Sequence, residues 1–241
     1  RFTRILGYLS GLTKSYEGEV VLGTATSTLD ASGEVTGVWD MRDVTLSDVR
    51  KIATGLTGRI EQVPPMVSAV KVGGRRLHEL ARAGVEVDRF PRPVTVHRLE
   101  VDPLPGAPAG VFEMKVECST GTYIRSLAAE IGAMLGGGAH LRNLRRTSVG
   151  SFTLEDAHRV GGIDRAHVIA PADAVRDMSQ VTVGSEIARL VAHGLALDKV
   201  SLGATGDGPW ALLDRRRRLL AVYKGTETDR LVAGCVLSAA G

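Results

Sequence analysis

The hydrophobic period changes within residues 111–135, and this change constrains the fold more than any other feature. Residues 111–118, "VFEMKVEC", alternate apolar and polar side chains as a half-buried β-strand does. From Tyr123 the apolar residues recur every three or four positions, which is typical of an amphipathic helix with Thr122 as its N-cap. The apolar stripe consists of Ile124, Leu127, Ala128, Ile131 and Leu135. Together the two patterns indicate a domain of the α+β class.

Arg125 falls in the first turn of this predicted helix, where the helix macrodipole is positive. A cation costs roughly 0.3–1 kcal/mol there unless another group offsets it. Glu130 is five residues away, outside the i+3/i+4 positions that meet on a helix, and makes a poor partner. We therefore expect a carboxylate from elsewhere, or a phosphate, to face Arg125.

The remaining pattern predicts a central mixed, largely antiparallel sheet with flanking helices. Strands are expected in "YEGEVVLGTATST", "RPVTVHRLEV" and "TSVGSFTL", and helices in residues 1–12 and in "TLSDVRKIATGL". Thr45 and Asp48 have the spacing of a capping box. Residues 62–93 read as an inserted arm with a Gly-Gly turn and a short helix that ends at Gly84. From about residue 161 the sequence changes to short strand patterns separated by polar turns, which indicates a small β-rich domain.

The charge distribution favours a polyanionic partner. The 241 residues carry a net charge of only +3, but residues 71–98 hold seven Lys/Arg against three Asp/Glu. Further basic residues lie in "HLRNLRR" (140–146) and in "RRRR" (215–218), which we place in a turn between strands. Aromatic residues make up 4%, which disfavours a wide base-stacking platform.

Several classes of protein lack support in the sequence. No phosphate-binding glycine loop, zinc-protease or EF-hand pattern occurs, so we expect neither a metal nor a cofactor. Cys118 and Cys235 are far apart and lack metal-ligand spacing, which favours a reducing, cytoplasmic setting. No apolar run is long enough to span a bilayer, so no membrane partner is expected.

"TYIRSLAAEIG" followed by "GGGAHLRNLRRTSVGSF" resembles the later motifs of TruB-type bacterial tRNA pseudouridine synthases. The resemblance continues in "KSYEGEVVLGTATSTLDASGEV", "EQVPPMVSAVKVGGRRLHELARAGVEV" and "RPVTVHRLEV", and covers roughly residues 1–155. It implies a catalytic domain over residues 1–160 with an RNA-binding arm at about 62–93. The tail, residues 165–241, resembles a PUA-type RNA-binding domain.

The resemblance implies a cofactor-free isomerisation of the tRNA T-loop uridine that becomes the Ψ of TΨC. The base is flipped out, detached from its ribose and rejoined through carbon five. The tRNA T-arm stem-loop would be the partner, with no obligatory protein partner and a monomer as the default. Arg125 matches the arginine that pairs with the catalytic aspartate. Tyr16 matches the tyrosine that stacks on the base and is the candidate for moving the proton at carbon five.

Other roles follow from the same resemblance. Tyr123 and Leu144 match residues that line the uridine pocket, and Asp30 matches a polar residue near the site. From their own context alone, Tyr16 and Tyr123 read simply as half-buried strand and helix residues. The RNA-facing or structural positions are Lys71, Arg145 and Arg146.

The family's catalytic aspartate lies in a motif resembling "GHTGALDPLATG", which does not occur in these residues. We expect that aspartate upstream of Arg1 and expect the chain as given to be inactive. Asp30, Asp40 and Asp43 lie in other motifs. One alternative is a non-catalytic tRNA-binding or RNA-folding module. Another is a relative that works inside a guide-RNA particle, against which the arm argues.

Overall fold

The computed structural model describes residues 2–237, which form two compact units. One unit spans residues 13–149, and the other joins residues 2–12 to residues 150–237. The second unit includes the chain's start because Ile5 is buried in one apolar cluster with Ala172, Val175 and Leu213. This division differs from the predicted boundaries of 1–160 and 165–241. The sequence pattern does not show that Ile5 packs against residues of the C-terminal part.

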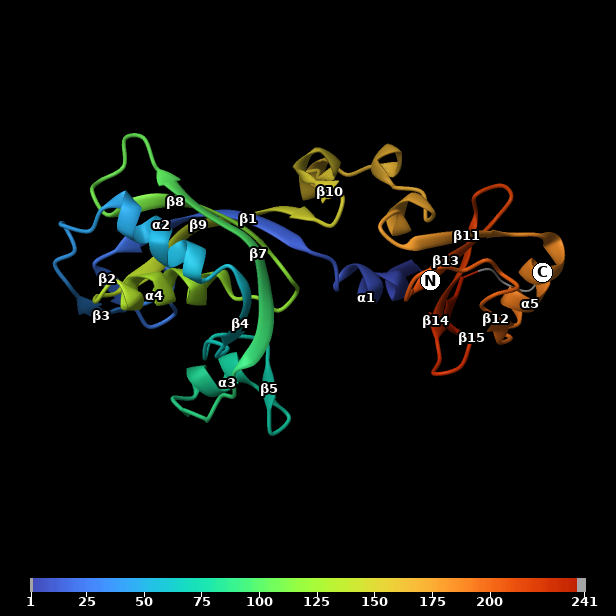
Figure 1. Ribbon diagram of the computed structural model, residues 1–241, viewed down its shortest axis with the longest axis horizontal. Helices are drawn as coiled ribbons and strands as arrows, with labels where there is room; N and C mark the ends of the chain where they lie inside the picture. The colour runs from blue at the N-terminus through green and yellow to red at the C-terminus, as the bar shows by residue number, and fades with distance from the viewer. Residues whose placement is uncertain (1, 238–241) are drawn as a thin grey trace. The chain divides into compact units, whose positions relative to one another are not determined.

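The unit of residues 13–149 is built on an antiparallel sheet with the order β9-β1-β8-β7-β4 (Figure 1). Its strands are β1 (Lys14–Leu22), β4 (Gly58–Gln62), β7 (Arg92–Pro103), β8 (Val111–Cys118) and β9 (Ala139–Val149). A hairpin of β2 (Thr24–Thr26) and β3 (Val35–Val38) follows β1. The α+β class and the largely antiparallel sheet are therefore confirmed.

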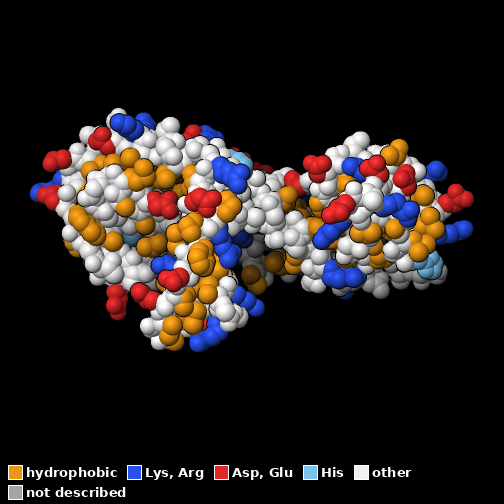
Figure 2. Space-filling view, turned by 60° about the horizontal axis from the view of Figure 1, so that its bottom comes forward, with side chains coloured by type: hydrophobic (Ala, Val, Ile, Leu, Met, Phe, Trp, Pro, Cys, Tyr) orange, Lys and Arg blue, Asp and Glu red, His pale blue; other side chains and the backbone are white. Residues whose placement is uncertain are grey.

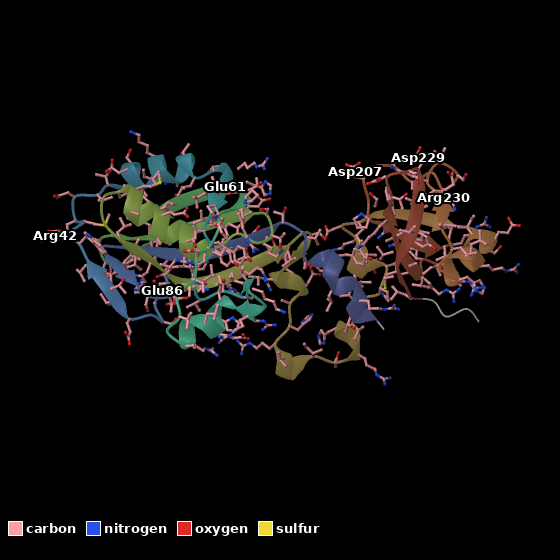
Figure 3. The ribbon with its side chains drawn as sticks, turned by 90° about the horizontal axis from the view of Figure 1, so that it is seen from below. Arg42, Glu61, Glu86, Asp207, Asp229 and Arg230 are labelled. Carbon is pink, nitrogen blue, oxygen red and sulfur yellow. The ribbon has the colours of Figure 1, made fainter. Side chains whose placement is uncertain are left out.

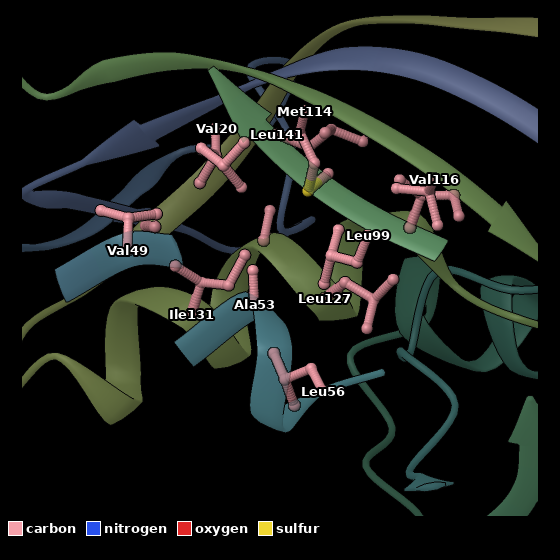
Figure 4. Packing of buried hydrophobic residues seen from close by; sticks show 14 of the residues in the cluster. Val20, Val49, Ala53, Leu56, Leu99, Met114, Val116, Leu127, Ile131 and Leu141 are labelled. Carbon is pink, nitrogen blue, oxygen red and sulfur yellow. The ribbon is translucent and has the colours of Figure 1, made fainter. Parts of the chain in front are cut away.

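Two helices, α2 (Leu46–Gly55) and α4 (Ile124–Met134), cover one face of this sheet. Figure 4 shows apolar side chains of the strands directed towards apolar side chains of both helices. The strands contribute Val20, Leu99, Met114, Val116 and Leu141 to this core, and the helices contribute Val49, Ala53, Leu127 and Ile131. The predicted stripe of α4 is the face that packs here, so the core fixes the rotation of α4 about its axis.

The sequence signals for helix starts succeed at α2 and miss by one residue at α4. The Thr45 hydroxyl accepts a hydrogen bond from the Asp48 amide, and Asp48 accepts one from the Thr45 amide, as the capping box predicts. At α4 the N-cap is Tyr123, not Thr122. The Thr122 hydroxyl donates to the carbonyl of Ser119 within the preceding turn, one residue before the cap.

The predicted arm is confirmed between β4 and β7, where it projects below the sheet in Figure 1. It contains a short hairpin of β5 (Lys71–Val72) and β6 (Arg75–Arg76), and then α3 (Leu77–Arg82). Gly84 ends α3 with a positive φ of 68°, which glycine adopts without strain. Leu77 and Leu80 of α3 are buried.

The second unit contains the predicted C-terminal β domain. Its sheet has the order β11-β13-β14-β15-β12, with one parallel pair, β11 with β13. The strands are β11 (Ser179–Val183), β12 (Leu197–Asp198), β13 (Trp210–Asp214), β14 (Leu219–Gly225) and β15 (Arg230–Val236). The helices are α1 (Leu6–Leu9) and α5 (Ser185–Ala192), and a short strand, β10 (Phe152–Thr153), begins the C-terminal part. Short 3-10 turns occupy Phe2–Ile5, Leu154–Asp156, Val160–Gly162, Arg165–His167 and Asp173–Val175.

Candidate active site

The guanidinium of Arg125 lies at the start of α4 and contacts two other segments of its unit. Its Nη1 donates to the Thr28 carbonyl at 3.1 Å and to Oδ2 of Asp30 at 2.9 Å. Its Nη2 donates to the Val67 carbonyl, at the base of the arm, at 2.8 Å. The Arg125 side chain is 23% exposed, so these partners offset the loss of water as well as the helix dipole.

Asp30 is held in its charged form. Burial raises the pKa of Asp30, but hydrogen bonds from Ser32 and Thr28 and the charge of Arg125 outweigh burial and hold that pKa below its usual value. Oδ1 accepts from the Thr28 hydroxyl at 2.6 Å and from the Ser32 amide at 3.1 Å. The Asp30 backbone bridges to Leu141 of β9, which fixes the loop against the sheet. Asp30 therefore orients Arg125 from a rigid position.

Arg125 retains hydrogen-bonding capacity beyond these contacts. A guanidinium has five N–H groups, and three of those on Arg125 have acceptors among residues 2–237. The Nε–H and one Nη2–H remain for a further anionic group. Glu130 is not among the partners of Arg125, as its spacing predicts, and burial raises the pKa of that carboxyl.

Tyr123, immediately before α4, is anchored by a buried glutamine from β4. Oε1 of Gln62 accepts from the Tyr123 amide at 2.9 Å, and Nε2 of Gln62 lies 3.4 Å from the Tyr123 carbonyl oxygen. Gln62 is 1% exposed. Because Gln62 is also the last residue before the arm, this contact joins the arm's base to the start of α4.

Tyr16 lies on β1 with its side chain half-buried against the core under the sheet. Its partner in the β1–β9 register is Arg146, whose side chain hydrogen bonds to the phenol. Burial raises the pKa of Tyr16, and the Arg146 hydrogen bond and charge partly oppose that rise. Burial also lowers the pKa of the neighbouring Lys14 ammonium, as does the charge of Arg146. The phenol is therefore protonated at neutral pH, beside cationic side chains.

Leu144 follows on β9, two residues before Arg146. Its side chain is unusually exposed for leucine, at 45%, and its Cδ1 lies 3.5 Å from the position that a Cβ on Gly18 would occupy. Tyr16 and Leu144 thus border one stretch of the β1–β9 pair, and the absence of a side chain on Gly18 lets Leu144 lie close to β1. A half-buried ring beside an exposed apolar side chain is suited to bind a flat, partly apolar group.

Comparison with known proteins identifies the family. Residues 1–124 match the family described as "TruB family pseudouridylate synthase (N terminal domain)". The chain belongs to the TruB family. Residues 125–186 match its companion, the "tRNA pseudouridylate synthase B C-terminal domain".

Curated relatives carry the name "tRNA pseudouridine synthase B". The protein from Symbiobacterium thermophilum is 46% identical over 81% of this chain and 66% of its own length. The protein from Geobacillus thermodenitrificans is 39% identical over 92% of this chain and 77% of its own length. Among solved structures, a chain of a Cbf5–Nop10–Gar1 complex is similar, with a TM-score of 0.69 and 24% identity over 99% of this chain and 70% of that chain. That likeness concerns the fold alone.

The fold brings some of the predicted site residues into contact and places others on exposed surfaces. Arg125 and Asp30 are in direct contact, and Tyr16 contacts Arg146. Lys71 is exposed on β5 of the arm, and Arg145 is exposed on β9 beside Glu17. Figure 2 shows basic side chains next to apolar ones on the projecting arm.

Sequence reasoning missed Gln62 and Lys14. Gln62 ends β4, a strand that the sequence pattern did not predict, and it is buried although it is polar. Lys14 lies two residues before Tyr16, and the period of two along a strand could have placed both on one face. No group of His, Cys, Asp or Glu suited to hold a metal ion occurs among the residues the structure describes.

The second unit holds a basic cleft of about 870 Å³. It is lined by α5 and by the turn between β13 and β14 that contains residues 215–218, as the sequence predicts for "RRRR". Arg218 pairs with Asp214 at 2.6 Å and Arg217 pairs with Asp173 at 3.1 Å. Arg215 and Arg216 are exposed at the same turn. A phosphate contact at this turn stays a prediction.

Proposed function

We propose that this TruB-family protein is a tRNA pseudouridine synthase that isomerises the uridine of the T loop. The observation that carries the proposal is Arg125, held by Asp30 and two carbonyls and retaining two N–H groups for a further anion. The names of the relatives support the reaction class, and the T loop comes from the motif resemblance.

The reaction exchanges one bond of the uridine for another. The bond from N1 of uracil to the ribose carbon breaks, the base turns, and C5 bonds to that carbon while C5 loses a proton and N1 gains one. An ionised carboxylate beside Arg125 would stabilise the positive charge that develops at the sugar or attack it directly. We propose that this carboxylate belongs to a segment outside the 241 residues and binds Nε–H and Nη2–H of Arg125.

Tyr16 and Leu144 would hold the flipped base, and Tyr16 would move the proton at C5. A protonated phenol must first give up its own proton, which the N1 position that gains one can take up; the resulting phenolate then accepts the proton of C5 and is a neutral phenol again. The adjacent Arg146 guanidinium would stabilise that phenolate by charge and hydrogen bonding. We accordingly assign Arg146 to the proton transfer as well as to RNA contact.

The arm would bind the phosphates of the T-arm stem. Its cationic side chains Lys71, Arg75 and Arg76 are all exposed. Because the base must leave the folded loop at a cost of roughly a few kcal/mol, phosphate contacts supply compensating free energy. We place the protein in the cytoplasm, in keeping with two buried free cysteines, and as a monomer. No helix within residues 2–237 has the length and apolar character to cross a bilayer.

The test is turnover of a synthetic T-arm stem-loop by the full-length protein, with pseudouridine measured by mass spectrometry after chemical derivatisation. We expect the wild type to convert the T-loop uridine. Arg125→Ala should lose about 10²-fold or more, as other removals of a preorganised charge partner do. Without this conversion, retained binding of the stem-loop would favour the non-catalytic RNA-binding alternative.

Arg42→Ala is a matched control, because it also removes one guanidinium. Arg42 lies at the outer end of its unit in Figure 3 and pairs with Asp40, with its side chain 84% exposed. Its loss should leave turnover unchanged. Wild-type turnover in Arg125→Ala would refute the role of Arg125.

A further inference from the structure

The pairing of β9 with β1 contains a bulge that decides where Leu144 points. Glu17 pairs with Arg145, but Glu19 pairs with Arg142, so two steps along β1 oppose three steps along β9. Asn143 lies within this bulge, and its φ of 53° is in the left-handed region. Asparagine tolerates this conformation better than most residues, but it remains unfavourable relative to an extended one.

The bulge places two leucines on the same face that regular pairing would separate. Leu141 and Leu144 are three residues apart, and residues at odd spacing on a regular strand point to opposite faces. Here Cδ1 of Leu141 and Cδ1 of Leu144 lie 3.2 Å and 3.5 Å from a Cβ position on Gly18. Both leucines therefore lie over Gly18. Without the bulge, only one of them could reach that face.

The same geometry brings Leu144 next to Tyr16. Tyr16 and Gly18 are two residues apart on β1 and share a face. Tyr16 opposes Arg146, and Leu144 is two residues from Arg146 on β9, so Leu144 is a diagonal neighbour of Tyr16. Diagonal neighbours are about 7–8 Å apart, within reach of an aromatic side chain or of one base between them.

One carboxylate on the opposite face secures the bulge. Oε2 of Glu19 accepts from Nε of Arg142 at 2.6 Å, and Oε1 of Glu19 accepts from Nδ2 of Asn143 at 2.7 Å. The Glu19 side chain is 17% exposed. The hydrogen bond from Asn143 is the largest influence on the pKa of Glu19. With the Arg142 contact it outweighs burial and holds that pKa below its usual value. The Glu19 carboxylate thus stays charged and binds Arg142 and Asn143, the two residues that precede Leu144.

We infer that Glu19 is a positioning residue: by holding Arg142 and Asn143 it fixes the β9 bulge that presents Leu144 beside Tyr16 in the uridine-binding site. This inference rests on the proposed function for the identity of the ligand. Glu19 itself lies on the other face of the sheet and does not touch the base. It acts through the backbone conformation of Asn143.

The catalytic test compares Glu19→Ala with Glu17→Ala in the full-length protein. Glu17 is an exposed carboxylate on the same strand and face, opposite Arg145, so its loss removes the same charge without releasing the bulge. Glu19→Ala should lower kcat by about 10- to 100-fold, the penalty of a shift near 1 Å in a reacting site. Its KM for the stem-loop should stay within about threefold, because the arm still binds. Glu17→Ala should keep wild-type kcat.

A second substitution separates positioning from general stabilisation. Glycine adopts a positive φ without strain, so Asn143→Gly should keep the bulge without help from Glu19. We expect the double variant Glu19→Ala/Asn143→Gly to recover most of the lost kcat. A wild-type kcat in Glu19→Ala, or a double variant no better than Glu19→Ala, would overturn the inference.

An NMR measurement tests the bulge independently of the reaction. In the wild type, a nuclear Overhauser effect is expected between the Leu144 methyl groups and the Gly18 α-protons. It should disappear in Glu19→Ala and return in the double variant. If the full-length wild type makes no pseudouridine but this NMR pattern holds, the proposed function fails and the positioning role stands. If the signal persists in Glu19→Ala, the positioning role fails.

Discussion

Replacing Gln62 with leucine removes the side chain that anchors Tyr123 while keeping a similar volume. The Tyr123 amide then loses its acceptor at 2.9 Å, and a leucine at a site that is 1% exposed leaves no room for water to replace it. An unsatisfied donor costs about 1–3 kcal/mol. The second contact, at 3.4 Å, is near the limit for a hydrogen bond and adds little. We expect the free energy of unfolding to fall by about 2 kcal/mol.

Urea denaturation followed by circular dichroism measures this loss directly. In a thermal scan of a chain this size, about 2 kcal/mol corresponds to a Tm lower by roughly 4–8 °C. Glu61→Leu is the matched control, because Glu61 precedes Gln62 on β4 with its side chain exposed (Figure 3). Surface changes of this kind shift stability by about 0.5 kcal/mol or less.

The same variant should affect turnover, since Tyr123 leads directly into the turn of α4 that carries Arg125. We expect kcat of the full-length protein to fall, whereas Glu61→Leu should leave it unchanged. A Gln62→Leu protein that is as stable as Glu61→Leu would refute the reasoning, because it would mean that the Tyr123 amide finds another acceptor at no cost.

Three further predictions concern a carboxylate, a helix cap and the arm. Because the folded-state pKa of Asp30 is lowered, its contribution to stability is present above the unfolded pKa of about 3.9 and is lost as pH falls through the folded value. Asp30→Asn should therefore lower stability at neutral pH and make stability fall less steeply below about pH 4, as pH-dependent urea titrations can show. Thr45→Ala removes the α2 cap and should cost about 1 kcal/mol in the same titration at neutral pH. Replacing Lys71, Arg75 and Arg76 with alanine should weaken stem-loop binding. If each contacts a phosphate, the slope of log K against log salt should decrease by roughly 2–3, and an unchanged slope would exclude the arm as the phosphate-binding surface.

Local physical chemistry explains which parts of the fold the sequence predicted. The α2 cap depends on Thr45 and Asp48, three residues apart, and the end of α3 depends on the backbone freedom of Gly84. The buried face of α4 follows from the helical spacing of its apolar residues. Each of these features is decided within a few residues, so a pattern in the chain is enough to find it. At Thr122 a local pattern misled by one residue, because Thr122 belongs to the turn that its hydroxyl closes with the Ser119 carbonyl, and α4 begins after Tyr123.

The partners of Arg125 could be anticipated only as a class. Its place in the first turn of a helix required an anion, and the motif resemblance implied a catalytic aspartate. The structure provides Asp30 as well, 95 residues away, together with carbonyls from two loops. Nothing in the spacing of these segments indicates that they meet, because the sheet and the packing of α4 beneath it bring them together.

The sequence by itself therefore determined the elements, the need for an anion at Arg125, the basic arm and the family. Only the tertiary structure decided that Asp30 orients Arg125, that Gln62 anchors Tyr123, and that a bulge turns Leu144 towards Tyr16. The physical reason is the distance along the chain between the residues that interact. Caps, turns and periodicity arise from neighbouring residues, whereas the register of β9 against β1 is set by contacts such as Glu19 with Asn143, 124 residues apart. A change of register by one residue reverses the face on which a side chain lies, and the sequence of one strand does not contain that information.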